Sequence, residues 1–179
     1  YVFLDVTDAK ARLLAELGDS VPAARKLAVL GNHDLWADHE RLERALEAAG
    51  VELLTNASVQ IELDHPGPPI RIIGLDEPWT GAIDADRAFA GHDDAPVAVV
   101  LCHSPDGLPD ALRAMSRLPT TRSALYVCGH THGGHVSTPW GPIMSGQGSV
   151  DPHHRHRGDA ALLGCGLDDQ DVTADPVPP

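Results

Sequence analysis

Three short apolar runs in this chain, at residues 27–30, 96–102 and 124–128, are each followed at once by a cluster of polar residues. The clusters are Gly31-Asn32-His33-Asp34, His103-Ser104-Pro105-Asp106 and Gly129-His130-Thr131-His132. Continuous apolar runs bounded by glycine or polar residues are typical of buried β-strands. In sheets covered by helices, ligands bind outside the carboxyl ends of the strands. We therefore expect three segments that are distant in the sequence to form one site at a sheet edge.

The segments between these runs carry helical and strand-like patterns. Apolar residues at helical spacing predict helices at 8–17, 38–49, 84–90 and 109–118, and Gly18 and Gly50 are stop signals for the first two. Period-two patterns predict strands at 51–54, 59–63 and 70–75, and the turn-rich segment 64–69 favours antiparallel pairing of the last two. We expect one α/β domain over residues 1–168, followed by an acidic, proline-rich and disordered tail at 169–179.

The charge and composition of the chain exclude some classes of function. A formal net charge of -13 argues against nucleic-acid binding through a basic surface, because such binding needs Lys and Arg beside phosphates. No apolar run reaches the ~20 residues of a membrane span. Three cysteines without a C-x-x-C spacing indicate a reducing compartment, so we expect a cytoplasmic protein. The chain starts without Met in a strand-like run, which indicates a longer parent whose preceding segment could carry a membrane anchor.

His130 and His132 are the strongest metal-binding signal in the chain. Their spacing puts both rings on one side of an extended segment, and imidazole is a common ligand for divalent metals. Asn32 and His103 are weaker signals when each is taken alone. An Asn-His-Asp turn is commonly a helix cap, and a histidine at a strand end is commonly a hydrogen-bonded polar residue. The order of the clusters along the chain, each at a strand end, favours a shared metal site.

These clusters resemble the last three sequence blocks of the calcineurin-like metallophosphoesterase superfamily. The blocks are Gly31-Asn32-His33-Asp34, His103 and Gly129-His130-Thr131-His132, and the following Gly133-Gly134 resembles the bacterial branch of the superfamily. The resemblance covers roughly residues 1–140 and implies a four-layer α-β-β-α sandwich. It also implies a hydrolase with two divalent metal ions, Mn, Zn or Fe, that acts on phosphodiesters or phosphomonoesters.

The same resemblance implies a role for each residue of the blocks. Asn32, His103 and His130 would bind one metal ion, and His132 would bind the other. His33 would stabilise or protonate the leaving oxygen of the substrate, and Asp34 would orient the ring of His33. Two metal ions about 4 Å apart can activate a water molecule and hold the oxygens of the phosphate.

The first two blocks of the superfamily, an Asp-x-His and a Gly-Asp, are not found upstream of Asn32. Gly18-Asp19 is interpreted as a helix stop and turn, and Tyr1-Val2 resembles the residues that follow the Gly-Asp block. We therefore expect an N-terminally truncated domain that lacks its first strand, binds one metal ion weakly and hydrolyses little or nothing. A segment at 160–167 is expected to be the remnant of a glycine-bearing strand beside the site.

Two other functions stay open at the level of sequence. One is a non-catalytic relative in which a partial metal site is structural, and the other is a metal-dependent hydrolase that acts on a non-phosphate substrate. The phosphoester substrate would be selected by rim loops such as 76–80, where Trp79 could shape a pocket, and by the segment after Trp140. The sequence leaves the substrate, the metal and the oligomeric state open.

Overall fold

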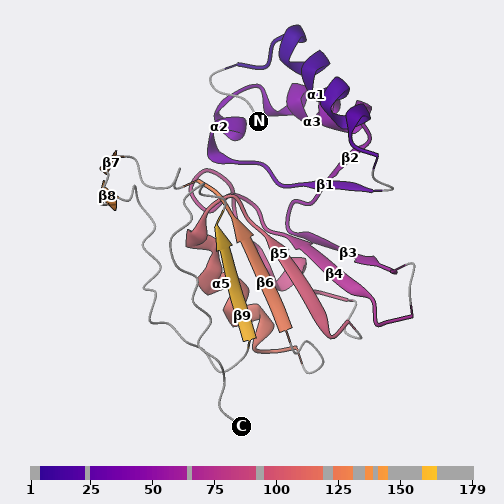
Figure 1. The fold of residues 1–179 in the computed structure, drawn as a ribbon, viewed down its shortest axis with the longest axis vertical. Helices are drawn as coiled ribbons and strands as arrows, with labels where there is room; N and C mark the ends of the chain where they lie inside the picture. Colours follow the sequence, from indigo (N-terminus) through magenta and orange to yellow (C-terminus); the bar gives the residue numbers. More distant parts are fainter. Residues whose placement is uncertain are drawn as a thin grey trace.

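The protein folds into a mixed α/β structure, as a computed structural model shows (Figure 1). The structure describes residues 5–22, 25–63, 66–91, 95–118 and 123–130, together with the backbone of strands at 136–138, 141–144 and 159–164. The helices are α1 (Asp8–Ser20), α2 (Asn32–Trp36), α3 (His39–Ala48), α4 (Ala85–Ala88) and α5 (Leu108–Met115), and a 3-10 turn, η1, spans Pro105–Gly107. The strands are β1 (Lys26–Ala28), β2 (Val51–Leu53), β3 (Ala57–Ile61), β4 (Ile70–Gly74), β5 (Val97–Leu101), β6 (Ser123–Cys128), β7 (Val136–Thr138), β8 (Gly141–Met144) and β9 (Asp159–Gly164). The predicted α/β class is thereby confirmed.

The described strands form three sheets. The largest has the order β3-β4-β5-β6-β9, in which β3 and β4 are antiparallel and all later neighbours are parallel. The predicted antiparallel pairing across the turn at 64–69 is confirmed by the register from Ile61 opposite Ile70 to Ala57 opposite Gly74. The expected strand at 160–167 is observed as β9, beside β6. The other sheets are the parallel pair β1-β2 and the antiparallel pair β7-β8.

The main hydrophobic core lies between one face of the five-stranded sheet and helices α4 and α5. Alternate residues of β5 point into it, because Ala98 and Val100 are buried whereas their neighbours are half-buried. The buried members of this core are Ile73, Leu75, Ala85, Ala88, Phe89, Ala98, Val100, Cys102, Leu108, Ala111, Ala114, Ala124 and Tyr126. Arg71 of β4 is also fully buried, and its Nη2 donates to the backbone oxygen of Ala90 at 2.8 Å. That bond fastens the segment after α4 to the sheet.

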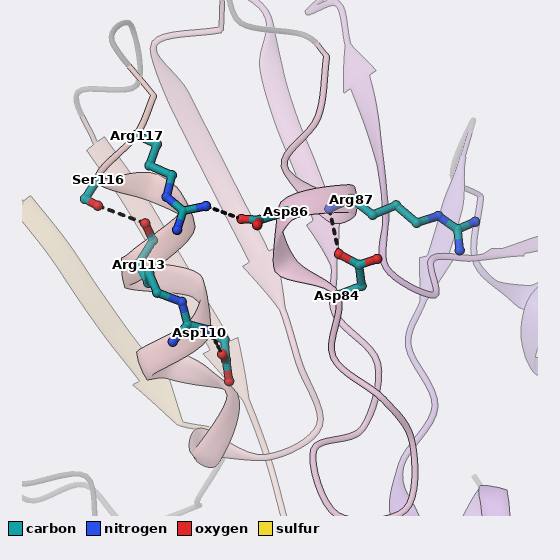
Figure 2. A network of polar contacts seen from close by, with 7 residues as sticks. All are labelled: Asp84, Asp86, Arg87, Asp110, Arg113, Ser116 and Arg117. Atoms are coloured by element: carbon teal, nitrogen blue, oxygen red, sulfur yellow. Dashed lines mark hydrogen bonds and ion pairs between the residues drawn. The ribbon is translucent and has the colours of Figure 1, made fainter.

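Ion pairs on the outer surface connect α4 with the end of α5 (Figure 2). Arg117 Nη1 lies 2.7 Å from Asp86 Oδ1, and Asp84 accepts from the backbone N–H of Arg87 at 2.9 Å, which caps α4. Arg113 pairs with Asp110 one turn earlier on α5. These side chains are exposed, so each pair contributes at most about 1 kcal/mol. The apolar face beneath them is the larger source of stability.

A second, smaller core is formed by α1, α3 and the segments beside β1. Its buried members are Val6, Leu30, Leu42 and Leu46. Figure 1 shows this part at one end of the molecule, with α1 and α3 above the short β1-β2 sheet. Thr7 Oγ1 accepts from the backbone N–H of Lys10 at 3.3 Å and caps α1.

The predicted stop of α1 at Gly18 is wrong, because the helix continues to Ser20. Gly18 is buried, and a Cβ atom there would lie 3.0 Å from the carbonyl oxygen of Ala49 and 3.1 Å from its Cβ. This glycine therefore allows α1 to approach the end of α3 closely. Gly50 does end a helix as predicted: it follows α3 in a left-handed conformation, with φ at +69°.

The tail predicted at residues 169–179 lies outside the described residues. Among the helices that the structure describes, none is both long and apolar enough to cross a membrane.

Candidate metal centre

The site lies where parallel strands of the five-stranded sheet end. Hydrogen bonding continues past the strands, since the backbone N–H of Cys102 donates to Val127 at 3.1 Å and that of Gly129 donates to His103 at 2.9 Å. These bonds place the residues after β5 and β6 side by side. The sequence-based expectation that these two polar clusters lie together at one sheet edge therefore agrees with the geometry.

His103 and His130 face each other across this edge. His103 Nε2 lies 3.2 Å from His130 Nδ1, and the two rings are nearly perpendicular, with centroids 5.1 Å apart. His130 has a positive φ of 70°, which is uncommon for a residue other than glycine and costs about 1 kcal/mol or more. Such strain is retained mainly where a side chain must point in one functional direction.

The separation of the two histidine nitrogens fits a shared metal ion. Two nitrogens that are each about 2.1 Å from one zinc ion lie roughly 3.2–3.4 Å apart at near-tetrahedral angles. The same 3.2 Å also fits a hydrogen bond in which one neutral ring donates to the other. The geometry is therefore compatible with both states, a hydrogen-bonded pair without metal and a pair of ligands with metal.

Asn32 is held beside this pair through its neighbour Gly31. A Cβ atom on Gly31 would lie 2.8 Å from Nδ1 of His103, so only glycine allows this approach. Asn32 is 3% exposed, and its Oδ1 is buried without a hydrogen-bond partner. Buried side-chain oxygens are nearly always satisfied, so the orphaned oxygen of Asn32, one residue after the glycine that contacts the His103 ring, is a candidate metal ligand. The donor set of one amide oxygen and two imidazole nitrogens suits Zn, Mn or Fe.

The neutral state of the His103 imidazole favours metal binding. Its burial lowers the pKa of the imidazole below the usual 6.5, and the nearby His130 lowers it further. The neutral ring keeps the lone pair that a metal requires. Two acidic residues, Glu77 and Asp34, act in the opposite direction on the same pKa and are therefore close enough to His103 to interact with it electrostatically.

His33 and Asp34 lie on α2, directly after Asn32. Asp34 is buried, and its Oδ2 accepts from the backbone N–H of Gly31 at 2.9 Å, which fixes the start of this short helix. The ring of His33 packs edge-on against Trp36, with centroids 4.7 Å apart. The predicted roles of both residues in catalysis stay predictions. His132, the fourth predicted ligand, lies outside the described residues.

The loop after β4, which the sequence indicates as a rim loop, lies at the same edge, and it contains a buried carboxylate whose contacts the sequence did not reveal. Glu77 is fully buried, and its Oε2 accepts from the backbone N–H groups of Trp79 at 2.8 Å and Thr80 at 2.7 Å. The ring of Trp79 packs against His130, with centroids 4.9 Å apart. The sequence signal for this loop is its position after a predicted strand. The contact between Trp79 and His130 depends on the sheet topology and cannot be read from the sequence.

Within the part of the chain that the structure describes, no group of three or more His, Cys, Asp or Glu side chains could hold a metal ion. The candidate site has two histidines, and the third predicted ligand, Asn32, is not one of these four residue types.

Comparison with known proteins identifies relatives of this chain. No protein-family model and no solved structure matches the chain. The chain is 30% identical over 121 residues to the uncharacterized metallophosphoesterase YkuE of Bacillus subtilis, covering 67% of this chain and 40% of that protein. It is 28% identical over 145 residues to the phosphodiesterase YaeI of Escherichia coli, covering 78% of this chain and 48% of that protein.

The chain belongs to the calcineurin-like metallophosphoesterase family. It spans less than half of the length of either relative.

Proposed function

We propose that this chain contributes to the active site of a metal-dependent phosphoesterase that hydrolyses phosphodiesters. The observation that carries the proposal is the pair of histidine nitrogens 3.2 Å apart, and the buried, orphaned oxygen of Asn32, whose neighbour Gly31 contacts the His103 ring, supports it. The printed names of the two relatives, a metallophosphoesterase and a phosphodiesterase, support the same reaction class.

Asn32 Oδ1, His103 Nε2 and His130 Nδ1 would hold one divalent ion, and His132 would contribute to a second. These ligands are neutral, so the positive charge of an ion remains available to a phosphate anion. The chemistry supplied by two such ions is the activation of water and the neutralisation of phosphate charge. We further propose that the β1-β2 sheet and the five-stranded sheet are the inner layers of a four-layer sandwich, in a single domain over residues 1–168.

The protein's own residues would orient the substrate and handle the proton. His33 would donate a proton to the leaving oxygen, because a protonated imidazole can act as a general acid. Asp34 would keep that ring in place from the same short helix. Because the sequence has no Asp-x-His upstream of Asn32, we expect these 179 residues to bind one ion and to turn over slowly.

Metal binding tests this proposal directly. We expect Mn²⁺ or Zn²⁺ to bind with a stoichiometry of about one, as measured by calorimetry, and His130→Ala to weaken binding by at least about a hundredfold. His39→Ala is a matched control, because His39 is exposed at the start of α3. Hydrolysis of bis(p-nitrophenyl) phosphate should depend on the added metal and stop with a chelator.

Three outcomes would argue against the proposal. Equal metal affinity in wild type and His130→Ala would show that His130 is not a metal ligand. Metal binding without hydrolysis of any phosphoester, in a chain extended by an N-terminal segment that carries the Asp-x-His and Gly-Asp blocks, would favour a non-catalytic metal-binding relative. Activity on amides or lactones, with none on phosphoesters, would favour a hydrolase of non-phosphate substrates.

A further inference from the structure

Trp79 places a large aromatic side chain beside the candidate metal centre. The residue is 41% exposed, and its ring packs edge-on against that of His130, with centroids 4.9 Å apart and an interplanar angle of 63°. An indole with this much surface in water is a ready contact for an apolar ligand group. Its neighbour His130 is a predicted metal ligand, so any such group would lie next to the bound phosphate.

The side chain of Trp79 is fixed by a hydrogen bond from its indole nitrogen. Nε1 donates to Asp106 Oδ2 at 2.7 Å, and the same carboxylate oxygen accepts from Ser104 Oγ at 3.3 Å. Ser104 is fully buried at the start of η1. The indole of the loop after β4 is therefore fastened to the loop after β5, while its ring contacts the loop after β6.

The backbone of Trp79 is fixed independently by Glu77. The buried carboxylate of Glu77 accepts from the backbone N–H of Trp79 at 2.8 Å, and from the backbone and hydroxyl of Thr80 at 2.7 and 2.9 Å. A group that is already held in place loses little conformational freedom when a ligand packs against it. The indole is thus preorganised, although it lies in a loop.

The hydrogen bond to Asp106 also decides what Trp79 can offer a ligand. The indole has one donor and no acceptor, and that donor is in use. Its exposed surface therefore offers apolar and π contacts, and it suits the organic part of an ester better than the phosphate oxygens. Trp36 is also exposed, but its ring contact is with His33 three residues earlier on the same helix.

We propose that Trp79 is a specificity-determining residue that contacts the organic group of the bound phosphoester and favours planar or apolar groups. This inference rests on the proposed function, because it needs a phosphate held at Asn32, His103 and His130. The substrate class it implies is a phosphoester in which an aromatic or other apolar group is attached close to phosphorus.

Phosphonates test this proposal without requiring turnover. Phenylphosphonate and methylphosphonate differ only in the organic group, and neither has an ester bond to hydrolyse. In the Mn²⁺-loaded full chain, we expect phenylphosphonate to bind about tenfold more tightly than methylphosphonate. Trp79→Ala should abolish this preference, while Trp79→Phe should keep most of it because an aromatic face remains.

Two further variants separate a direct contact from a structural effect. Asp106→Ala keeps the indole but releases it, and should lower the phenyl preference about threefold, less than Trp79→Ala. Trp36→Ala removes a comparably exposed indole and should leave the preference in place. The Mn²⁺ affinity is measured by calorimetry for every variant, and the phosphonate affinities are compared at saturating Mn²⁺, so that a change in metal binding is separated from a change in the phenyl preference.

The outcomes distinguish this inference from the proposed function. A phenyl preference that persists in Trp79→Ala, or that disappears in Trp36→Ala instead, overturns the inference and leaves the metal site intact. Equal weakening of both phosphonates in Trp79→Ala shows that the indole acts only by supporting His130, which also overturns it. Absence of Mn²⁺ and phosphonate binding in wild type overturns the proposed function and this inference together.

Discussion

Two regions of this protein differ in how much core they bury. The sheet region, which comprises β3 to β6 with α4 and α5, packs its apolar face into a large continuous core. The N-terminal region, residues 5–53, packs four buried side chains around α1 and α3, and leaves Leu13 and Leu17 of α1 largely exposed. Because buried apolar area is the main source of stability, the sheet region should be the more stable of the two.

The candidate metal centre takes ligands from both regions. The sheet region supplies His103 and His130, whose backbones are joined by the hydrogen bond from Gly129 to His103. The N-terminal region supplies Asn32, which reaches the pair through the close contact of Gly31 with the ring of His103. A rigid sheet edge therefore fixes the two imidazoles, whereas the position of the amide depends on how well the smaller region docks.

The largest expected effect is the loss of free energy of unfolding when a buried side chain of either core is truncated. Ile73 and Leu42 are both fully buried, the first in the sheet region and the second in the N-terminal region. We expect Ile73→Ala to lower the free energy of unfolding by about 4 kcal/mol and Leu42→Ala by about 2–3 kcal/mol, because a small core can relax around the cavity. Urea denaturation measures both values.

Native-state hydrogen exchange gives the matching control. Amides of β4 and β5 should exchange only through global unfolding, while those of β1 and β2 should exchange through smaller openings. Leu42→Ala should then accelerate exchange in the N-terminal region first. A larger loss of stability from Leu42→Ala than from Ile73→Ala would reverse the ranking of the two regions.

A smaller effect is expected where the regions meet. A Cβ atom on Gly31 would lie 2.8 Å from the His103 ring, so Gly31→Ala should push the two regions apart and displace Asn32 or His103. We expect metal affinity, measured by calorimetry, to fall by about 10–100-fold, as for other changes that displace a ligand without removing it. Gly129→Ala also neighbours a predicted ligand, but among the described residues its Cβ would meet nothing closer than the carbonyl oxygen of His103 at 3.9 Å. Equal effects of the two substitutions would show that the Gly31 contact does not position the site.

The parts of the fold that depend on local pattern were predictable from the sequence. The helix at 38–49 and the hairpin of β3 and β4 follow from periodicity, capping and turn residues, and the structure confirms them within a few residues. The end of α1 was not predictable in this way. Gly18 has the sequence signature of a helix stop, but its function is to let α1 approach Ala49, and that contact joins residues 31 positions apart.

The candidate site was predictable to a similar extent. The rule that ligands gather at the carboxyl ends of strands led to His103 and His130, which contact each other. The loop with Glu77 and Trp79 was predicted only as a rim loop, because its hydrogen bonds and its ring contact with His130 join separate loops, which no spacing encodes. The requirement for glycine at position 31 also emerges only when the N-terminal region packs against the sheet.

The smallest expected effect is a pH dependence that arises in the sheet region. Burial and the nearby His130 lower the pKa of His103 below 6.5 in the folded protein, so the unfolded chain takes up a proton first as the pH falls. Stability from this group is therefore fully present above about pH 6.5 and is lost as the pH falls toward the lowered pKa. In metal-free protein, His103→Gln should flatten this part of the pH profile in urea denaturation, whereas His39→Gln, on the exposed surface of α3, should not.

If hydrogen exchange shows the acid-dependent loss in β1 and β2 and leaves β5 and β6 protected, the effect belongs to the N-terminal region. His103 in the sheet region would then not be the group that titrates.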